Sequence, residues 1–521
     1  MRALTMLCLA GAVGLTTAAA QYAYSQSSYV PAAKFCANDT SAPCSIIPAY
    51  IGSDKMLANS VGYNGIIGGL PTSAASDPQT PFDNMSWQSF VGLNWMINME
   101  SAPAAAGLAA GGVRVWQSWL KVNQVFGNSP EQATCANKSG LPVISIGSDG
   151  NGNPSQKNDD YYQASTDVPL IDINGNWTLY ERRLNFIELA YLKAPNGKLD
   201  NTLTTVQGQT NFVAAGQTVA FPAVSTAPVG LHGAMELKIA WRILGPNDDA
   251  SRYITQNVLL AVAKDLVNGT QEICAEVTVG MVGMHIIQRN LDYATNKNLL
   301  PEWIWSTFEH IDNAPLAAAA CDPKAPLSCK TLNQPSCGEA ARGAGIGSYY
   351  VPVTSAVPIA TNVKPTASSK LPSFAWDTKQ PYAKGYVQPA GVGERTFYLG
   401  PQVVRCWQIY DLTMQLNAQW QTALANSNSV LANYQLVGTQ WGAGLETRLD
   451  PYPANAVPGL LSNATLETYI QNNTQPTASG GVGSCIGCHR AATLVDNKTP
   501  SDFSFLPSLA AGTPTRFNFA Q

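Results

Sequence analysis

The sequence predicts an α+β fold with a β-rich central domain, flanking helices, long disulfide-tied loops and a small helical segment near the C-terminus. Three observations lead to this prediction. Between residues 172 and 305, apolar side chains tend to recur every second residue, which is typical of strands. Residues 85–95, 112–126 and 406–424 instead repeat apolar side chains at helical spacing. Stretches rich in proline, glycine and alanine separate these segments and indicate loops.

The first twenty residues are typical of a cleavable export signal. Met1 and Arg2 form a short positive start, and an apolar run follows. Ala18-Ala19-Ala20 offers the small side chains of a cleavage site, so the mature chain is expected to begin at Gln21. No later segment reaches the roughly 18 uninterrupted apolar residues of a membrane-spanning helix. We therefore expect a periplasmic or secreted protein with no integral membrane segment in the mature chain.

The remaining sequence divides by composition and periodicity. Strands are expected at 176–191, 235–244, 254–263 and 272–288, where turn pairs such as Asn268-Gly269 separate them. A further short helix is expected at 466–470. The predicted regions are a signal peptide (1–20), an irregular N-terminal lead-in (21–84), a helical segment (85–170), the β-rich central domain (171–313), a Pro/Gly-rich connection (314–400) and a helical C-terminal region (401–521).

Charge is sparse and slightly acidic. Only 12% of residues are charged, and the formal net charge is −4. Loss of Arg2, the one charged residue of the signal, would make it −5. Lys and Arg form no clusters, which argues against nucleic acids and anionic membranes as partners.

Eleven cysteines point to an oxidising compartment. Cys8 lies in the signal, and Cys485 and Cys488 belong to a motif discussed below. The other eight form an even set, as expected of disulfides. We expect Cys36 to pair with Cys44, and two of the nearby Cys321, Cys329 and Cys337 to pair with each other. The pairing of the rest stays open; the eight are Cys36, Cys44, Cys135, Cys274, Cys321, Cys329, Cys337 and Cys406.

The motif with the clearest chemistry is Cys485-Ile-Gly-Cys488-His489. Its C-x-x-C-H spacing is that of covalent c-type haem attachment. Two thiols at this separation can form thioethers with the two vinyl groups of haem, and the adjacent imidazole can bind the iron as the proximal ligand. The other interpretation is a disulfide or half of a zinc site. Zinc would need a second ligand pair, and no second C-x-x-C occurs. The sequence therefore predicts one covalent haem c, held by Cys485, Cys488 and His489.

A ligand on the other side of the iron would have to come from upstream. Residues 490–521 contain neither Met nor His, and the last methionine is Met414. The iron is therefore five-coordinate or receives a distal ligand from the body of the chain. The candidates for that ligand are His232, His285 and His310, with Met284 as a further possibility.

The three upstream histidines have two further interpretations. Together with Glu236 or Glu309, they could bind a non-haem metal. They could also be structural side chains that are hydrogen-bonded in the core. The aromatic run at 303–310 (WIWSTFEH) also has two interpretations: it could provide an electron path near haem, or it could pack in the core.

Several stretches also carry a family resemblance: 87–95 (WQSFVGLNW), 233–242 (GAMELKIAWR), 283–287 (GMHII), 303–313 (WIWSTFEHIDN), 484–490 (SCIGCHR) and 502–505 (DFSF). They resemble large exported bacterial proteins of a cytochrome c family with a single C-terminal haem motif, over most of residues 85–510. The resemblance implies electron transfer or haem chemistry on Cys485, Cys488 and His489, and no particular substrate.

The function predicted from these observations is that of an exported monohaem c-type cytochrome. It would transfer one electron at a time with a redox partner protein or a small-molecule donor or acceptor. The chain is larger than electron carriage requires, which motivates an alternative. This is an oxidase-like or peroxidase-like haem enzyme with an open distal position, acting on a small molecule in a pocket of the central domain. A third hypothesis is a binding or assembly protein with a structural haem.

Overall fold

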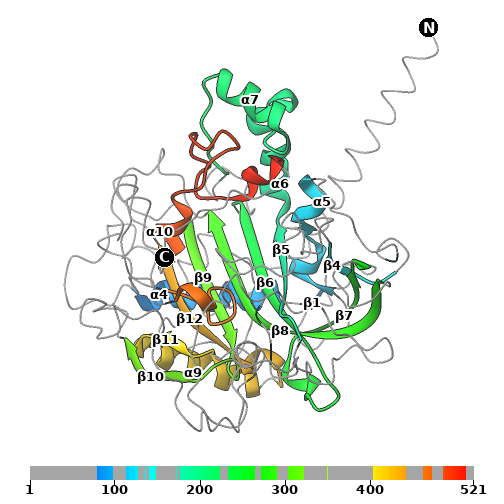
Figure 1. The fold of residues 1–521 in the computed structure, drawn as a ribbon. Coiled ribbons are helices and arrows are strands. Elements are labelled where there is room, and N and C mark those ends of the chain that lie inside the picture. The colour runs from blue at the N-terminus through cyan, green and yellow to red at the C-terminus, as the bar shows by residue number, and fades with distance from the viewer. Residues whose placement is uncertain are drawn as a thin grey trace, which may run out of the picture.

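The computed structural model describes sixteen stretches of the chain, and its helices and single large curled sheet confirm the α+β class (Figure 1). The described residues are 79–94, 96–97, 113–126, 135, 140–147, 170, 172, 176–222, 233–264, 272–289, 303–321, 349, 403–426, 428–441, 461–471 and 485–511. None of the helices in these stretches combines the length and apolar character needed to cross a membrane.

The large sheet has eight strands, and most of its neighbours are antiparallel. Its main path runs β12 (Tyr434–Trp441), β9 (Trp303–His310), β8 (Ile273–Arg289), β6 (Met235–Ile243), β5 (Leu179–Leu184) and β3 (Leu120–Lys121). The long β8 pairs with β6 and β9 along its second half, and its first half pairs with β7 (Thr255–Val262). β4 (Val143–Ile146) runs parallel to β7, which makes the sheet mixed.

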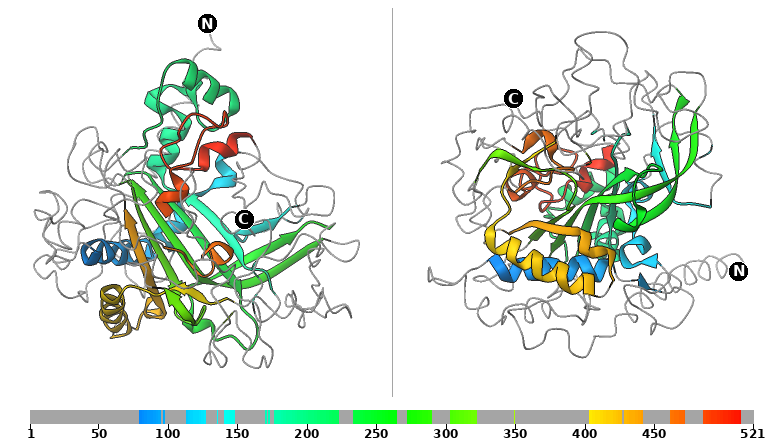
Figure 2. Two further views of the ribbon diagram at one scale, coloured as in Figure 1. Left: turned by 60° about the vertical axis from the view of Figure 1, so that its left-hand side comes forward. Right: turned by 90° about the horizontal axis from the view of Figure 1, so that it is seen from below.

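Two helices cover one face of this sheet, which we call the helix face. α4 (Gln79–Leu93) and α9 (Asp411–Asn426) lie side by side against it (Figure 2). Trp87 stacks on Trp420 with ring centroids 5.7 Å apart, and Phe90 stacks on Phe308 at 4.2 Å. Both helices bury large aromatic side chains here, and such burial dominates core energetics.

The opposite face, which we call the motif face, is covered by α6 (Phe186–Lys193), residues 461–471 and the C-terminal residues 485–511. The last of these contain α10 (Cys485–His489) and the 3₁₀ helix η11 (Leu506–Ala511). They lie near the end of the sheet at which α6 and α7 (Val206–Ala214) are found (Figures 1 and 2). The apolar side chains that join the sheet to these segments are Leu184, Ile287, Trp303, Trp305, Ile486, Leu494, Leu506 and Leu509.

The strand predictions for 235–244, 254–263 and 272–288 are confirmed as β6, β7 and β8. The prediction for 176–191 is wrong in its second half, where α6 begins. Asn185 ends the strand because its side chain accepts hydrogen bonds from the backbone N–H groups of Glu188 and Met235. An N-cap of this kind satisfies helix donors that would otherwise be free.

The helix predicted at 112–126 is also wrong. The chain instead forms β2 (Val113–Arg114), the 3₁₀ helix η1 (Val115–Ser118), β3 and a short α5 (Val122–Phe126). Periodicity alone could not anticipate that Leu120 and Lys121 pair with the edge of β5. β2 pairs with β1 (Met96–Ile97) in a separate two-stranded sheet.

The predicted helices elsewhere are partly confirmed. The 85–95 helix is α4, which begins earlier at Gln79, and the 406–424 helix is α9, which begins later at Asp411. Cys406 lies instead in β11 (Arg405–Trp407), which runs parallel to β10 (Leu316–Cys321). At 466–470 the helix is a 3₁₀ turn, η10 (Thr468–Ile470). The region expected to be helical, 401–521, also contributes β12 to the large sheet.

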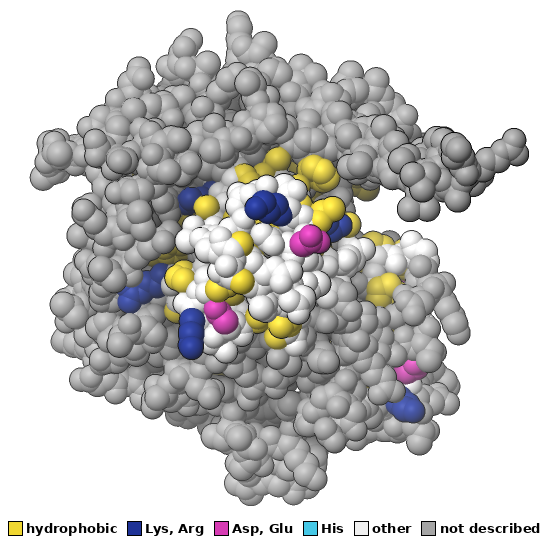
Figure 3. All heavy atoms as spheres, turned by 90° about the horizontal axis from the view of Figure 1, so that it is seen from above, with side chains coloured by type: hydrophobic (Ala, Val, Ile, Leu, Met, Phe, Trp, Pro, Cys, Tyr) yellow, Lys and Arg dark blue, Asp and Glu magenta, His cyan; other side chains and the backbone are white. Residues whose placement is uncertain are grey.

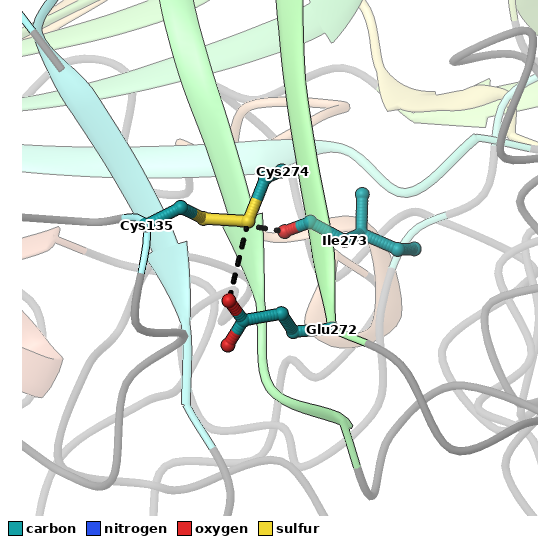
Figure 4. Close-up of a disulfide and its surroundings, with 4 residues drawn as sticks. All are labelled: Cys135, Glu272, Ile273 and Cys274. Atoms are coloured by element: carbon teal, nitrogen blue, oxygen red, sulfur yellow. Dashed lines mark hydrogen bonds between the residues drawn. A yellow bond between two sulfur atoms is a disulfide. The ribbon is translucent and has the colours of Figure 1, made fainter. Parts of the chain in front are cut away.

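One disulfide of the described residues joins Cys135 to Cys274 at the start of β8, with the two Cα atoms 6.1 Å apart (Figure 4). The Glu272 carboxylate lies 3.6 Å from the Cys274 sulfur. These three side chains are close enough for a metal site, but disulfide sulfurs are not thiolate ligands. Cys406 is also in a disulfide. Cys36, Cys44, Cys329 and Cys337 lie outside the described residues, so the pairings expected for them stay predictions.

Candidate haem-binding site

The C-x-x-C-H motif forms the one-turn helix α10 on the motif face. Ile486 anchors it, since its side chain is buried in the core and its backbone N–H donates to Gln440 Oε1 of β12 at 3.0 Å. Residues three apart in a helix lie on the same side, so Cys485 and Cys488 share one side of α10. Both thiols are free, and neither is bonded to the other. This pair of sulfurs therefore fits two-point attachment to one ligand.

Burial holds both cysteines in the thiol form. It raises the pKa of Cys488 to about 12 and that of Cys485 well above its ordinary value, and the nearby carboxylate of Glu467 adds to both effects. Addition of an S–H group across a vinyl double bond consumes a thiol and leaves an uncharged thioether. The thiol is therefore the form that both cysteines would offer to such a reaction.

His489 is prepared to bind a metal through one nitrogen. Its Nδ1 donates a hydrogen bond to the backbone carbonyl of Phe503, 2.8 Å away. A proton fixed on Nδ1 leaves the lone pair of Nε2 free for a metal, which is the usual arrangement of metal-binding histidines. Burial lowers the pKa of His489 to about 4, so the imidazole is neutral at physiological pH. The residues present therefore fit the proximal side of a c-type haem.

Aromatic rings fix the plane of the His489 side chain. Trp305 of β9 and Phe505 of the C-terminal segment contact it with ring centroids at 5.6 and 5.0 Å. The next ring along β9, Trp303, is 6.1 Å from Trp305, and its Nε1 donates to Asp502 Oδ1 at 3.2 Å. The aromatic run of β9 thus packs in the core and also contacts the ring of His489.

A row of basic side chains crosses the sheet on the same face. Strand register places Arg182 of β5 opposite Lys238 of β6, and Lys238 opposite His285 of β8. Each is partly exposed, while its neighbours within the same strand are buried. Side chains opposite one another in adjacent strands project from the same face. The row therefore forms a partly exposed strip across an otherwise buried part of the sheet.

Glu467 faces this row from residues 461–471. Its Oε2 lies 3.2 Å from His285 Nε2 and accepts a hydrogen bond from the Asn463 N–H at 2.8 Å. Burial opposes ionisation of Glu467, but His285 and this N–H outweigh it, so its pKa lies below the ordinary value. The segment can lie this close to β8 because Gly283 has no side chain: a Cβ there would be 2.5 Å from Thr465 Oγ1.

The structure brings one of the predicted distal residues towards the motif. His285, Glu467 and Lys238 all interact electrostatically with His489. His310 lies elsewhere: it is fully buried on the helix face, its ring stacks on Tyr253 at 4.8 Å, and its Nε2 lies 3.0 Å from the Arg252 carbonyl oxygen. It is five strand residues from Trp305, about 17 Å at roughly 3.4 Å per residue.

Met284, the other candidate ligand from β8, is buried in the helix-face core, on the other side of the sheet from the motif. His232 lies outside the described residues. His285 and His310 project from opposite faces of the sheet, and Glu309 is bound by Arg405. The described histidines and glutamates therefore do not assemble the non-haem metal site that the sequence left open.

Several residues of the site escaped sequence reasoning. Lys238 and Glu467 carry no motif, and their proximity to Cys485 and Cys488 arises from strand register and from the return of residues 461–471 across β8. A signal for Lys238 does exist, since it is one of two cations, with Arg242, within the largely apolar strand 235–243. The Phe503 carbonyl has no side-chain signature at all.

No protein-family model, curated protein or solved structure matches the chain.

Proposed function

We propose that the chain is an exported monohaem c-type cytochrome that transfers one electron at a time. The observation that carries this proposal is the pair of free thiols on one side of α10, next to a neutral imidazole whose Nδ1 is held by the Phe503 carbonyl. Cys485 and Cys488 would hold the haem covalently, and His489 would bind its iron. When bound, the haem supplies a one-electron couple whose potential responds to its ligands and surroundings.

The protein's own contribution would be to fix and shield this group. Trp305 and Phe505 orient His489, and the apolar side chains around Ile486 exclude water. The disulfide Cys135–Cys274 is in keeping with a periplasmic or secreted location. Among the described residues, the surface seen in Figure 3 carries basic, acidic and apolar side chains close together. A redox partner protein or a small-molecule donor or acceptor that approached this patch would meet side chains of both signs.

Haem attachment tests the proposal directly. Full-length protein produced in a bacterial host with haem-attachment machinery should give a haem-stained band that survives denaturing electrophoresis. Cys485→Ala and Cys488→Ala should each weaken this band, and the double variant should abolish it, because the thioether bonds are lost. Lys498→Ala, in an exposed turn of the same segment, should stain like the wild type. A colourless wild-type protein from such a host would refute the proposal.

We further propose that His285 is the distal ligand in this cytochrome. It is the described histidine that interacts with His489 from the motif face. Its Nε2 already faces Glu467, so coordination through Nε2 would have to displace this contact. The same contact favours the alternative function, a haem enzyme whose iron stays open. There the His285–Glu467 pair would be an acid–base pair that moves protons to and from a small substrate such as a peroxide.

Carbon monoxide binding separates these two functions. With His285 on the iron, the ferrous wild type should bind carbon monoxide slowly or not at all, whereas His285→Ala should bind it fast and completely. Met414→Leu, which alters an exposed methionine of α9, should match the wild type. Fast, complete binding by the wild type would support the enzyme. If neither the wild type nor His285→Ala bound carbon monoxide, a group other than His285 would occupy the distal position.

A further inference from the structure

Two glutamates are buried together between α6 and β6. Glu188 is 0% exposed and Glu236 is 8% exposed. Glu188 is the third residue of α6, a position from which a glutamate often bonds the N-cap backbone. Here the Asn185 N–H already donates to the Met235 carbonyl at 3.0 Å. The Glu188 carboxyl is directed to Glu236 instead, and the two carboxyls are within hydrogen-bonding contact.

This contact requires a proton. Within the described part of the chain, neither oxygen of Glu188 and only one of Glu236 receives a hydrogen bond from an N–H or O–H donor. Two ionised carboxylates cannot donate to each other, and like charges in one buried site cannot both persist. Burial and then the neighbouring Glu236 raise the pKa of Glu188 well above its ordinary value, and burial also raises that of Glu236.

The charged groups around the pair do not neutralise it fully. Arg182 of β5 favours the ionised form of Glu236, whereas Asp502 of the C-terminal segment disfavours ionisation of both glutamates. Asp502 has its own partner, Arg289 of β8, at 3.7 Å. One negative charge on the pair is thus compensated from β5, and a second is not. These surrounding charges fit a pair of carboxyls that shares one proton and carries one negative charge.

The pair is joined to the proximal histidine through one peptide unit. The Ser504 side chain forms a hydrogen bond with Glu236. The peptide bond before Ser504 contains the Phe503 carbonyl that accepts the proton of His489 Nδ1. A group that accepts a hydrogen bond from the non-coordinating nitrogen of a metal-binding histidine changes the basicity of that ligand, and through it the properties of the metal. A change of charge on the pair is therefore placed to act on the iron that His489 would bind.

We propose that the Glu188–Glu236 pair is the proton acceptor that accompanies reduction of the haem. This inference rests on the proposed cytochrome function and adds that a proton is taken up with each electron. With the haem oxidised, the pair holds one proton. When a one-electron donor reduces the haem, the pair takes a second proton from the solvent buffer. One electron and one proton then enter together, and the net charge of the buried region stays constant.

The test is the midpoint potential of the full-length, haem-loaded protein as a function of pH. The reduced form binds the proton more tightly, so the potential should fall as pH rises. Over the pH range in which the pair takes up its second proton, the slope should approach about 59 mV per pH unit, the value for one proton per electron. Glu188→Gln leaves one carboxylate with a permanent hydrogen-bond donor and should flatten this slope. Asp200→Asn, which alters an exposed carboxylate, should keep the wild-type slope.

A second measurement needs no variant. The infrared difference spectrum between the reduced and oxidised wild type should gain a protonated-carboxyl band on reduction. If Glu188→Gln does not fold, Glu236→Gln replaces it with the same expectation. A wild-type potential independent of pH, a slope that survives Glu188→Gln or Glu236→Gln, or a missing carboxyl band would overturn the proposal. These outcomes arise in a haem-loaded protein, so they differ from a colourless protein, which would refute the cytochrome function itself.

Discussion

The Phe503 carbonyl depends on a turn that its own residue does not favour. Asp502 and Phe503 have φ values of 51° and 66°, in the left-handed region. Aspartate tolerates this region, but a bulky side chain such as that of phenylalanine is strained there, at a cost of order 1–3 kcal/mol. The contacts of Asp502 hold the turn: its Oδ2 accepts from the Phe221 N–H at 2.8 Å, and its Oδ1 accepts from Trp303.

At the residue scale we therefore expect Asp502→Asn to lower the free energy of unfolding. The amide keeps one acceptor, turns a donor towards the second N–H and leaves Arg289 buried without its carboxylate. Loss of one member of a buried ion pair typically lowers the free energy of unfolding by about 3 kcal/mol or more. Urea unfolding followed by tryptophan fluorescence measures this. If Asp502→Asn lost no more stability than Asp200→Asn, the turn would not depend on Asp502.

At the scale of elements, an ion-pair cluster holds β3 to β5. Lys121 Nζ of β3 lies 2.6 Å from Glu181 Oε2, and Arg183 Nε lies 2.8 Å from Glu181 Oε1. Burial opposes ionisation of Glu181, but the two cations outweigh it and lower its pKa from 4.5 to about 2. This cluster stabilises the strand that interrupts the helix predicted at 112–126.

The pH dependence follows from the direction of that shift. A carboxyl whose pKa is lower in the folded protein stabilises it above the unfolded value, and the contribution disappears as the pH falls from about 5 towards 2. From the size of the shift, Glu181 contributes about 3 kcal/mol at neutral pH. We expect Glu181→Gln to unfold more easily than the wild type at pH 7, with the difference shrinking as the pH is lowered. A difference that stayed constant from pH 7 to acid would contradict this account.

At the scale of the whole molecule, local signals predicted the fold class and the strands β6, β7 and β8, because buried strands keep their alternating pattern in sequence. The same signals failed at residues 112–126 and 176–191. There a cap at Asn185 and pairing with the β5 edge decided the structure, and both depend on neighbours that periodicity does not encode. β12 was missed within a region expected to be helical for the same reason.

The candidate site likewise contains residues that local sequence predicts and residues that only tertiary contacts bring together. Cys485, Cys488 and His489 were predicted because their chemistry requires adjacent positions in sequence. His285 was one of three equivalent candidates until strand register placed it on the motif face and His310 on the other. Glu188, Glu236 and Glu467 meet through tertiary contacts between distant segments, and no spacing rule connects them.

The position of β12 also has a consequence for incomplete chains. β9 lies between β8 and β12, and all eight of its side chains are buried. A chain shortened before Tyr434 would present the outer edge of β9, with Ile304, Trp305 and Phe308, as an open row of backbone donors and acceptors. Apolar open edges recruit further strands and aggregate. Fragments from interrupted synthesis or proteolysis would therefore associate through β9, whereas the intact chain covers this edge with its own late strand.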